Sequence, residues 1–189
     1  MTHMKYRQRL LAGLLGSLLA LWTGFASGAD ESSREYQIKA AFLYHFAKFV
    51  EWPARALPGP SDALSLCILG RDPFGPLLDE TLAGKTIQGR PLAITRHETL
   101  PPAQTCHMLF ISASKQHLLE KKLAALAGAP VLTIGDTEQF ASRGGMIELY
   151  LDDNTVRFKI NRRAAKDAGL TISSHLLKLA TLVPDQSGN

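Results

Sequence analysis

Residues 63–70 read ALSLCILG, and similar apolar runs follow at 107–112 (HMLFIS) and 130–134 (PVLTI). Each run is short, almost without charge and flanked by turn-forming residues, which is typical of strands buried on both faces of a sheet. Helix-forming stretches at 74–82 and 115–127 separate the runs. Strands that alternate with helices imply parallel crossovers, so we expect an α/β fold whose sheet carries helices on both faces.

The remaining segments extend this sheet. Residues 86–96 predict a strand whose alternation is broken by Gly89 and Pro91, which suits an edge position. Residues 146–151 and 155–160 alternate apolar and polar side chains around a polar turn, and they predict an antiparallel hairpin at the sheet's edge. Two short helices complete the prediction, at 162–168 and 173–182. The expected fold is a single-domain, three-layer, Rossmann-like mixed sheet with a C-terminal hairpin.

A long helix is predicted before the first strand, at residues 31–50. Two apolar stripes run along it, one made of Tyr36, Ala40, Leu43, Ala47 and Val50, the other of Ile38, Phe42, Phe46 and Phe49. A helix that is apolar over more than half its circumference needs burial on two sides. It is either a central core helix or a helix that presents one face, with Phe42 and Phe46, to a partner or a second copy of the chain.

The amino terminus has the layout of a secretory signal peptide. Lys5, Arg7 and Arg9 precede an apolar run at 10–25, which ends on small residues. We expect cleavage after Ala29; the alternative is an uncleaved anchor, because about 20 apolar residues can span a bilayer. Two further segments then make up the secreted chain, a domain at 30–183 and a flexible tail at 184–189.

Removing the leader changes the charge of the protein. The whole chain has 21 Lys and Arg against 17 Asp and Glu. Residues 1–29 contain three of these cations and none of the acids, so the secreted part is left with a net charge of +1. A nearly neutral domain gives no electrostatic reason to expect a nucleic-acid partner.

Two cysteines remain in the secreted part, Cys67 and Cys106. Both lie in or beside predicted strands, and an even pair without metal-type spacing in an oxidising compartment predicts a disulfide. A thiol and base pair made of Cys106 and His107 is the competing interpretation. Adjacent residues on a strand point to opposite faces, so this pair cannot form the required hydrogen bond.

Sequence motifs for catalysis or metal binding are missing. The histidines of the secreted part show no zinc-type pairing, and no nucleophile elbow is present; these histidines are His45, His97, His107, His117 and His175. We therefore expect no enzyme, no metal site and no cofactor, although an active site of scattered residues would escape this search. Arg162, Arg163 and His175 can hold an anionic or small polar ligand, or they can form a solvated basic turn and a helix-terminal histidine.

Several collinear motifs resemble one family. They are YQIKAAFLYHFAKFVEWP (36–53), LCILGRDPFG (66–75), CHMLFIS (106–112), VLTIGD (131–136), GGMIELYL (144–151), VRFKIN (156–161) and AGLTISSHLLKLA (168–180). Their order and spacing resemble the YfiR-like family of periplasmic proteins. The resemblance implies a repressor that binds the periplasmic sensor portion of a membrane-bound diguanylate cyclase, so that cyclic di-GMP and biofilm formation fall. It also implies a homodimer, redox-sensitive disulfides, no cofactor, and contact with the membrane only through the partner.

The resemblance carries over to particular residues. Cys67 and Cys106 match the family's core disulfide pair, but a second cysteine pair near the hairpin is missing here, so we interpret the disulfide as structural. The expected partner surface includes Glu148 and Tyr150 of the hairpin together with Phe42 and Phe46 of the first helix. The expected small-ligand pocket is made of Trp52, Arg162 and His175. A different class of function remains open: a periplasmic module that binds a small ligand and feeds a sensor kinase or a transporter.

Overall fold

A computed structural model of the protein describes residues 27–57, 59 and 62–184. Contacts between Cα atoms divide the chain into two units, residues 1–35 and 36–189, and the second contains the whole sheet. The apolar run of the predicted leader lies outside the described residues, so cleavage after Ala29 stays a prediction. The predicted tail at 184–189 also stays a prediction, because residues 185–189 lie outside the described part. Within the described part, no helix has both the length and the apolar character needed to cross a membrane.

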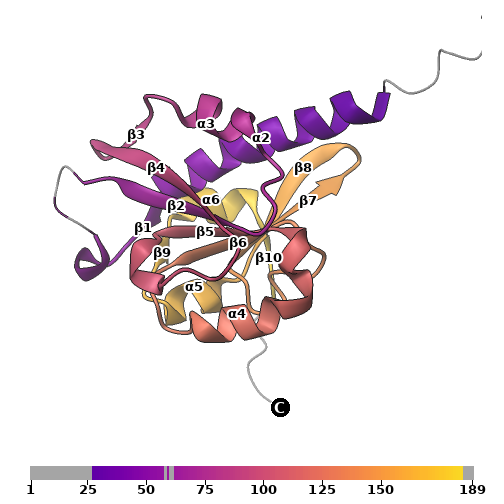
Figure 1. Ribbon diagram of the computed structural model, residues 1–189. Coiled ribbons are helices and arrows are strands. Elements are labelled where there is room, and N and C mark those ends of the chain that lie inside the picture. Colours follow the sequence, from indigo (N-terminus) through magenta and orange to yellow (C-terminus); the bar gives the residue numbers. More distant parts are fainter. Residues whose placement is uncertain (1–26, 58, 60–61, 185–189) are drawn as a thin grey trace, which may run out of the picture. The chain divides into compact units, whose positions relative to one another are not determined.

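An eight-stranded mixed sheet forms the centre of the second unit (Figure 1). Its inner strands pair in parallel in the order β6, β5, β2, β4, as expected from the apolar runs. Their bounds are β2 Leu64–Leu69, β4 Arg90–His97, β5 Met108–Ile111 and β6 Leu132–Gly135. The predicted α/β class with parallel crossovers is therefore confirmed.

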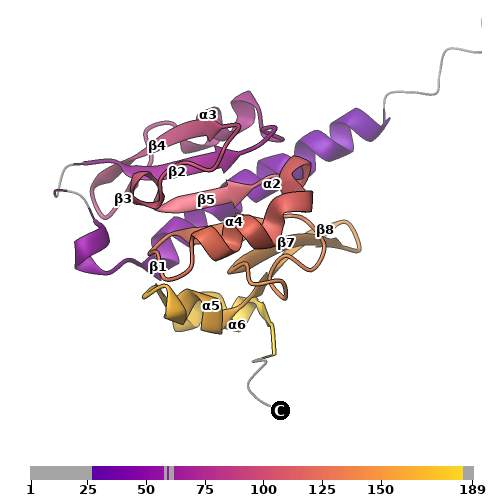
Figure 2. The same ribbon diagram turned by 60° about the horizontal axis from the view of Figure 1, so that its bottom comes forward.

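Helices cover both faces of this sheet, which confirms the three-layer architecture. Helix α2 (Ser27–Phe49) and helix α3 (Pro76–Leu82) contribute Leu43 and Leu78 to the larger apolar cluster, which lies on one face. Helix α4 (Leu119–Ala125), which follows the 3-10 helix η3 (Ala113–Leu118), contributes Leu119 to the smaller cluster on the other face. In Figure 2, α4 lies in front of β5 and α2 lies behind it.

The segment predicted as one edge strand is a hairpin. Strand β3 (Thr86–Ile87) pairs antiparallel with the start of β4, and the turn consists of Gln88 and Gly89 at φ values of 51° and 81°. Two central residues with positive φ form the type of turn that matches the twist of paired strands. The edge of the sheet is therefore β3, and β4 lies one place further in, between β3 and β2.

The C-terminal hairpin is present, but it does not end the sheet. Strands β7 (Ile147–Asp152) and β8 (Thr155–Ile160) pair antiparallel, and β10 (Thr181–Leu182) adds to β8 in parallel as the outermost strand. The predicted helix at 173–182 is consequently shorter, because its last residues form β10. The connecting helices are α5 (Arg162–Asp167) and α6 (Ser174–Leu179).

A separate two-stranded sheet joins distant parts of the chain. Strand β1 (Val50–Glu51) follows α2 directly and pairs antiparallel with β9 (Thr171–Ile172). This pairing ends α2 at Phe49, one residue before the predicted end. Two further 3-10 helices lie in loops, η1 at Ala54–Ala56 and η2 at Ala103–Thr105.

Candidate functional site

The two cysteines form a disulfide between neighbouring parallel strands. Cys67 lies in β2, and Cys106 lies two residues before β5, with 5.8 Å between their Cα atoms. Both side chains are buried in the smaller apolar cluster, beneath α4. The cross-link thus joins β2 to the start of its neighbour β5 and contributes to the core on that face.

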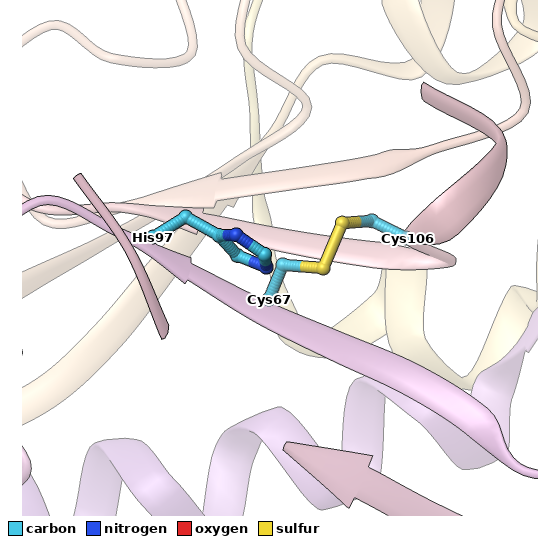
Figure 3. Close-up of side chains that lie close together, drawn as sticks. All are labelled: Cys67, His97 and Cys106. Carbon is cyan, nitrogen blue, oxygen red and sulfur yellow. A yellow bond between two sulfur atoms is a disulfide. The ribbon is translucent and has the colours of Figure 1, made fainter. Parts of the chain in front are cut away.

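His97 lies beside this disulfide, as Figure 3 shows. Its Nε2 is 2.9 Å from the Thr95 hydroxyl oxygen, and the Thr95 hydroxyl donates a hydrogen bond to the Cys67 sulfur over 3.4 Å. The parallel register of β2 and β4 places Thr95 opposite Cys67 and His97 opposite Leu69. Sequence reasoning missed this histidine, because the register between two strands cannot be read from either strand alone.

His107 has a structural environment on the opposite side of the strand from Cys106. Its Nδ1 accepts a hydrogen bond from the Ser65 amide over 3.0 Å, so Nε2 carries the proton and donates it to the Ala56 carbonyl over 3.0 Å. Burial lowers the pKa of His107, and the positive charge of Arg90 lowers it further. Burial and the Arg90 charge therefore favour the neutral imidazole, although the hydrogen bond to the Ala56 carbonyl opposes them by raising the pKa. No hydrogen bond joins this ring to the Cys106 sulfur among the described residues.

In the part of the chain that the structure describes, Trp52 and Arg162, two of the three residues predicted for a ligand pocket, line different hollows. Trp52 lines a hollow of about 220 Å³, where its indole N–H donates to the His107 carbonyl over 3.1 Å. Arg162 lines a different groove, of about 610 Å³. His175 is exposed, lines neither of these two, and rests against the Phe49 ring at a centroid distance of 5.3 Å. The strand pair β1–β9 lies between the hollow and the groove: Glu51 borders the hollow, and its pairing partner Thr171 borders the groove.

The groove beside α5 is basic. Its charged lining residues are Arg162, Arg163, Lys166 and Asp167. Arg163 lies 3.7 Å from the Asp167 carboxylate. Three cations and one anion leave the groove as a whole with an excess of two positive charges. A concave surface with this charge attracts anions.

Two of the residues predicted for a partner surface are inside the protein. Glu148 is 2% exposed; its carboxylate accepts from the Lys159 ammonium over 2.7 Å and from the Ala141 amide over 3.0 Å. Phe46 is 0% exposed and packs on Phe158 within the larger cluster. The structure therefore gives both side chains a role in the core, and neither is available to a partner on the surface of this chain.

The other two predicted partner residues are partly accessible. Tyr150 is half-buried, and the Lys159 ammonium lies 4.7 Å from the centre of its ring. Phe42 is half-buried as well, and its ring stacks on Phe46 at a centroid distance of 5.7 Å. Within the second stripe of α2, Ile38 is the most exposed side chain, at 39%. The helix is thus mainly a core helix.

A buried ion pair that sequence reasoning missed fixes α2 to the end of β6. The Lys39 ammonium lies 2.8 Å from the Asp136 carboxylate, and both side chains are at most 5% exposed. The Tyr36 hydroxyl donates to the same carboxylate oxygen over 2.9 Å. A lysine in an apolar helix and an aspartate after a buried strand were visible in the sequence, but their separation of 97 residues gave no signal of contact.

Comparison with known proteins identifies the family. The family model described as YfiR/HmsC-like matches residues 36–181, which is well over half of the chain. The chain belongs to the YfiR/HmsC-like family. No curated protein matches it. Among solved structures, a conserved domain protein from Vibrio cholerae O1 biovar El Tor strain N16961 aligns with a TM-score of 0.53 at 14% identity, covering 77% of this chain and 60% of that one. That likeness shows the fold alone, and the chain spans less than two thirds of that protein's length.

Membership of the YfiR/HmsC-like family confirms the resemblance seen in the sequence motifs. At the level of the family, these proteins are periplasmic regulators of a diguanylate cyclase. The disulfide between Cys67 and Cys106 agrees with a location in an oxidising compartment.

Proposed function

We propose that this YfiR/HmsC-like protein is exported through a cleaved leader and represses an inner-membrane diguanylate cyclase by binding the cyclase's periplasmic sensor portion. The family match over residues 36–181 is the observation that carries the proposal. The protein acts as a homodimer, uses no catalytic residues and no cofactor, and reaches the membrane only through its partner.

Repression is then a question of differential affinity. A binding protein shifts a receptor between two states by no more than the difference between its affinities for them. A hundredfold preference for the inactive cyclase corresponds to about 2.7 kcal/mol. A rigid binding surface can distinguish the two states of the cyclase, and the disulfide-bonded sheet provides a rigid support for such a surface.

The outer face of the β7–β8 hairpin is the partner surface that we propose. Tyr150 and Arg157 lie opposite each other on this face, with Tyr150 half-buried and Arg157 exposed. Tyrosine and arginine are, together with tryptophan, enriched among the side chains that dominate the binding energy of protein interfaces. Glu148, which lies on the same face, holds Lys159 in place beneath the tyrosine ring and supports this surface from within.

The test is a binding measurement between the exported protein and the periplasmic domain of a cyclase encoded beside it. We expect micromolar or tighter binding under oxidising conditions. Tyr150→Ala and Arg157→Ala should each weaken it by about tenfold or more, as expected for residues that dominate an interface. Lys121→Ala changes an exposed cation of α4 and serves as the matched control, with no expected effect.

Cells provide the second readout. Deleting the gene should raise cyclic di-GMP, and the wild-type protein should restore the low level, whereas the two hairpin variants should not. A protein that does not bind the cyclase domain at micromolar concentrations, or a deletion that leaves cyclic di-GMP unchanged, contradicts the proposal.

The basic groove beside α5 favours a second candidate, a periplasmic module that binds a small anionic ligand and feeds a sensor kinase or a transporter. Arg162, Arg163 and Lys166 supply the positive charge. This candidate predicts saturable binding of a small anion without any protein partner, and Arg162→Ala should abolish it. The repressor predicts a complex with the cyclase while the groove is empty, so the two are separated by one titration in the absence of small molecules.

A further inference from the structure

Three side chains that zinc prefers meet at one point of the smaller core. One donor atom each from Cys67, His97 and Cys106 lies within 4.8 Å of the other two (Figure 3). Two cysteines and one histidine are a known ligand set for zinc, which leaves a fourth position for water. While the sulfurs are bonded to each other they offer no thiolates, so this set is complete only in the reduced protein.

We propose that the reduced protein binds one zinc ion through Cys67, His97 and Cys106. A dithiol reductant supplies two electrons and two protons to the disulfide and becomes a disulfide itself. Zinc then displaces the two thiol protons and forms two zinc–sulfur bonds, and a nitrogen of the neutral His97 ring supplies the third ligand. The proposal does not depend on the repressor function, because it concerns the chain's own sulfurs.

The backbone positions suit this change. Tetrahedral zinc with zinc–sulfur bonds of about 2.3 Å needs sulfurs about 3.8 Å apart. The Cα atoms are 5.8 Å apart. Rotation about the Cα–Cβ bonds can therefore supply the wider sulfur spacing, and the two strands do not have to separate.

Polar groups around the sulfurs favour the thiolate form. The Thr95 hydroxyl already donates to the Cys67 sulfur, and it also contacts His97 Nε2. A hydrogen bond to a charged sulfur stabilises the thiolate, and so would the zinc ion bound to it. Side chains that hydrogen-bond to a metal-ligating residue, as Thr95 does to Cys67, are a common feature of metal centres.

A metal ion can also reach the cluster. The sulfurs are buried on the α4 side, but Thr95 is exposed and His97 is half-buried on β4. Strand β4 lies next to the two-residue edge strand β3. Access is therefore through the β4 side of the sheet, past the two side chains that connect the sulfurs to solvent.

Zinc binding and the disulfide exclude each other. A thiolate bound to zinc cannot form the sulfur–sulfur bond until the metal leaves. The metal should therefore slow reoxidation of the reduced protein, and the oxidised protein should have no affinity for the metal at this cluster.

The experiment uses the exported protein in two states, oxidised as isolated and reduced with a phosphine that is then removed without oxygen. Zinc is titrated against a chromophoric chelator, and cobalt replaces zinc to report sulfur ligation through its thiolate charge-transfer absorption. We expect one zinc per reduced chain and none per oxidised chain. His97→Gln should weaken binding by about tenfold or more, while His117→Gln, an exposed histidine in η3, should leave it unchanged.

Circular dichroism of the same samples shows whether the reduced chain is folded, with and without zinc. Zinc that restores the folded spectrum in the wild type and not in His97→Gln supports the site. The proposal is overturned if the reduced wild type binds no zinc, if His97→Gln binds as tightly as the wild type, or if the zinc-bound chain stays unfolded. Each of these results leaves the cyclase-binding measurement unaffected, so the two proposals fail independently.

Discussion

Glu148 is a buried carboxylate with two partners, and its replacement tests whether its role is internal. Glu148→Gln removes the charge that holds Lys159 and retains an oxygen for the Ala141 amide. Lys159 is partly exposed and can be solvated, so we expect a loss of about 1–2 kcal/mol in the free energy of unfolding. Urea denaturation measures it, with the exposed Glu138→Gln as the control that should change stability by less than about 0.5 kcal/mol.

The binding assay separates this effect from a surface role. The folded Glu148→Gln variant should bind the cyclase domain through the same outer face as the wild type. A variant of unchanged stability that has lost binding would instead place Glu148 in direct contact with the partner.

His107 should make stability depend on pH. Because its pKa is lowered, the folded protein keeps the ring neutral at pH values where the unfolded chain takes up a proton. The free energy of unfolding should therefore fall as the pH drops below about 6.5, the ordinary value, and this contribution should level off below the lowered pKa.

His107→Asn removes the titration and retains an acceptor for the Ser65 amide. The difference between wild type and variant, measured by denaturation between neutral and mildly acidic pH, should shrink as the pH falls. The exposed His117→Asn should keep the wild-type slope. A pH-independent difference for His107→Asn would show that the ring has the same pKa in the folded and unfolded chain.

Single positions also show what the sequence could and could not predict. The two cysteines were identified because their number and compartment determine their chemistry. Glu148 was expected at a partner surface from the family resemblance, and it does lie on the other face of β7 from the core residues Ile147 and Leu149. Its burial depends on the loop around Ala141, which closes over it from seven residues away. No local pattern encodes such a contact.

Helix α2 is held to the sheet by a polar clamp as well as by its apolar face. Lys39 pairs with Asp136 at the end of β6, and Tyr36 donates to the same carboxylate. Lys39→Met leaves a buried carboxylate without its cation, which we expect to cost about 3–5 kcal/mol. Chemical denaturation measures this cost, and Lys48→Met, on the exposed side of the same helix, should cost less than about 0.5 kcal/mol.

The partner substitution makes the test specific. The double variant Lys39→Met with Asp136→Asn also removes the carboxylate charge. It should recover part of the stability lost in Lys39→Met, because no uncompensated buried charge remains. A double variant that is less stable by the sum of two large single losses would show that the two residues act separately.

Elements with a strong local pattern were predicted, and elements formed by pairing alone were not. The apolar runs of β2, β5 and β6 and the turn of the β7–β8 hairpin follow from composition and spacing. Strands β1, β9 and β10 are two residues long and exist because a distant strand is present: Val50 pairs with Ile172, for example. Short strands have no periodicity to detect. The same limit hid His97, which reaches the disulfide only through the register of β4 on β2.

The two faces of the whole sheet are packed differently. The larger apolar cluster contains α2, α3 and most of the aromatic core residues. The smaller cluster contains α4, one buried phenylalanine, Phe140, and the disulfide. A short helix and a few aliphatic side chains provide less apolar burial, so we infer that the covalent link supplies a greater share of the stability on this face.

Removing the disulfide should accordingly weaken the whole domain. The cross-linked residues are 39 apart in sequence, and the loop-closure entropy for this length corresponds to about 4 kcal/mol. We expect Cys67→Ala, Cys106→Ala and the double variant to lose similar amounts in metal-free denaturation, because the first substitution already breaks the cross-link and the second adds only a small packing loss. Losses that simply add, or that stay below about 1 kcal/mol, would mean that the smaller cluster holds this face of the sheet without the covalent link.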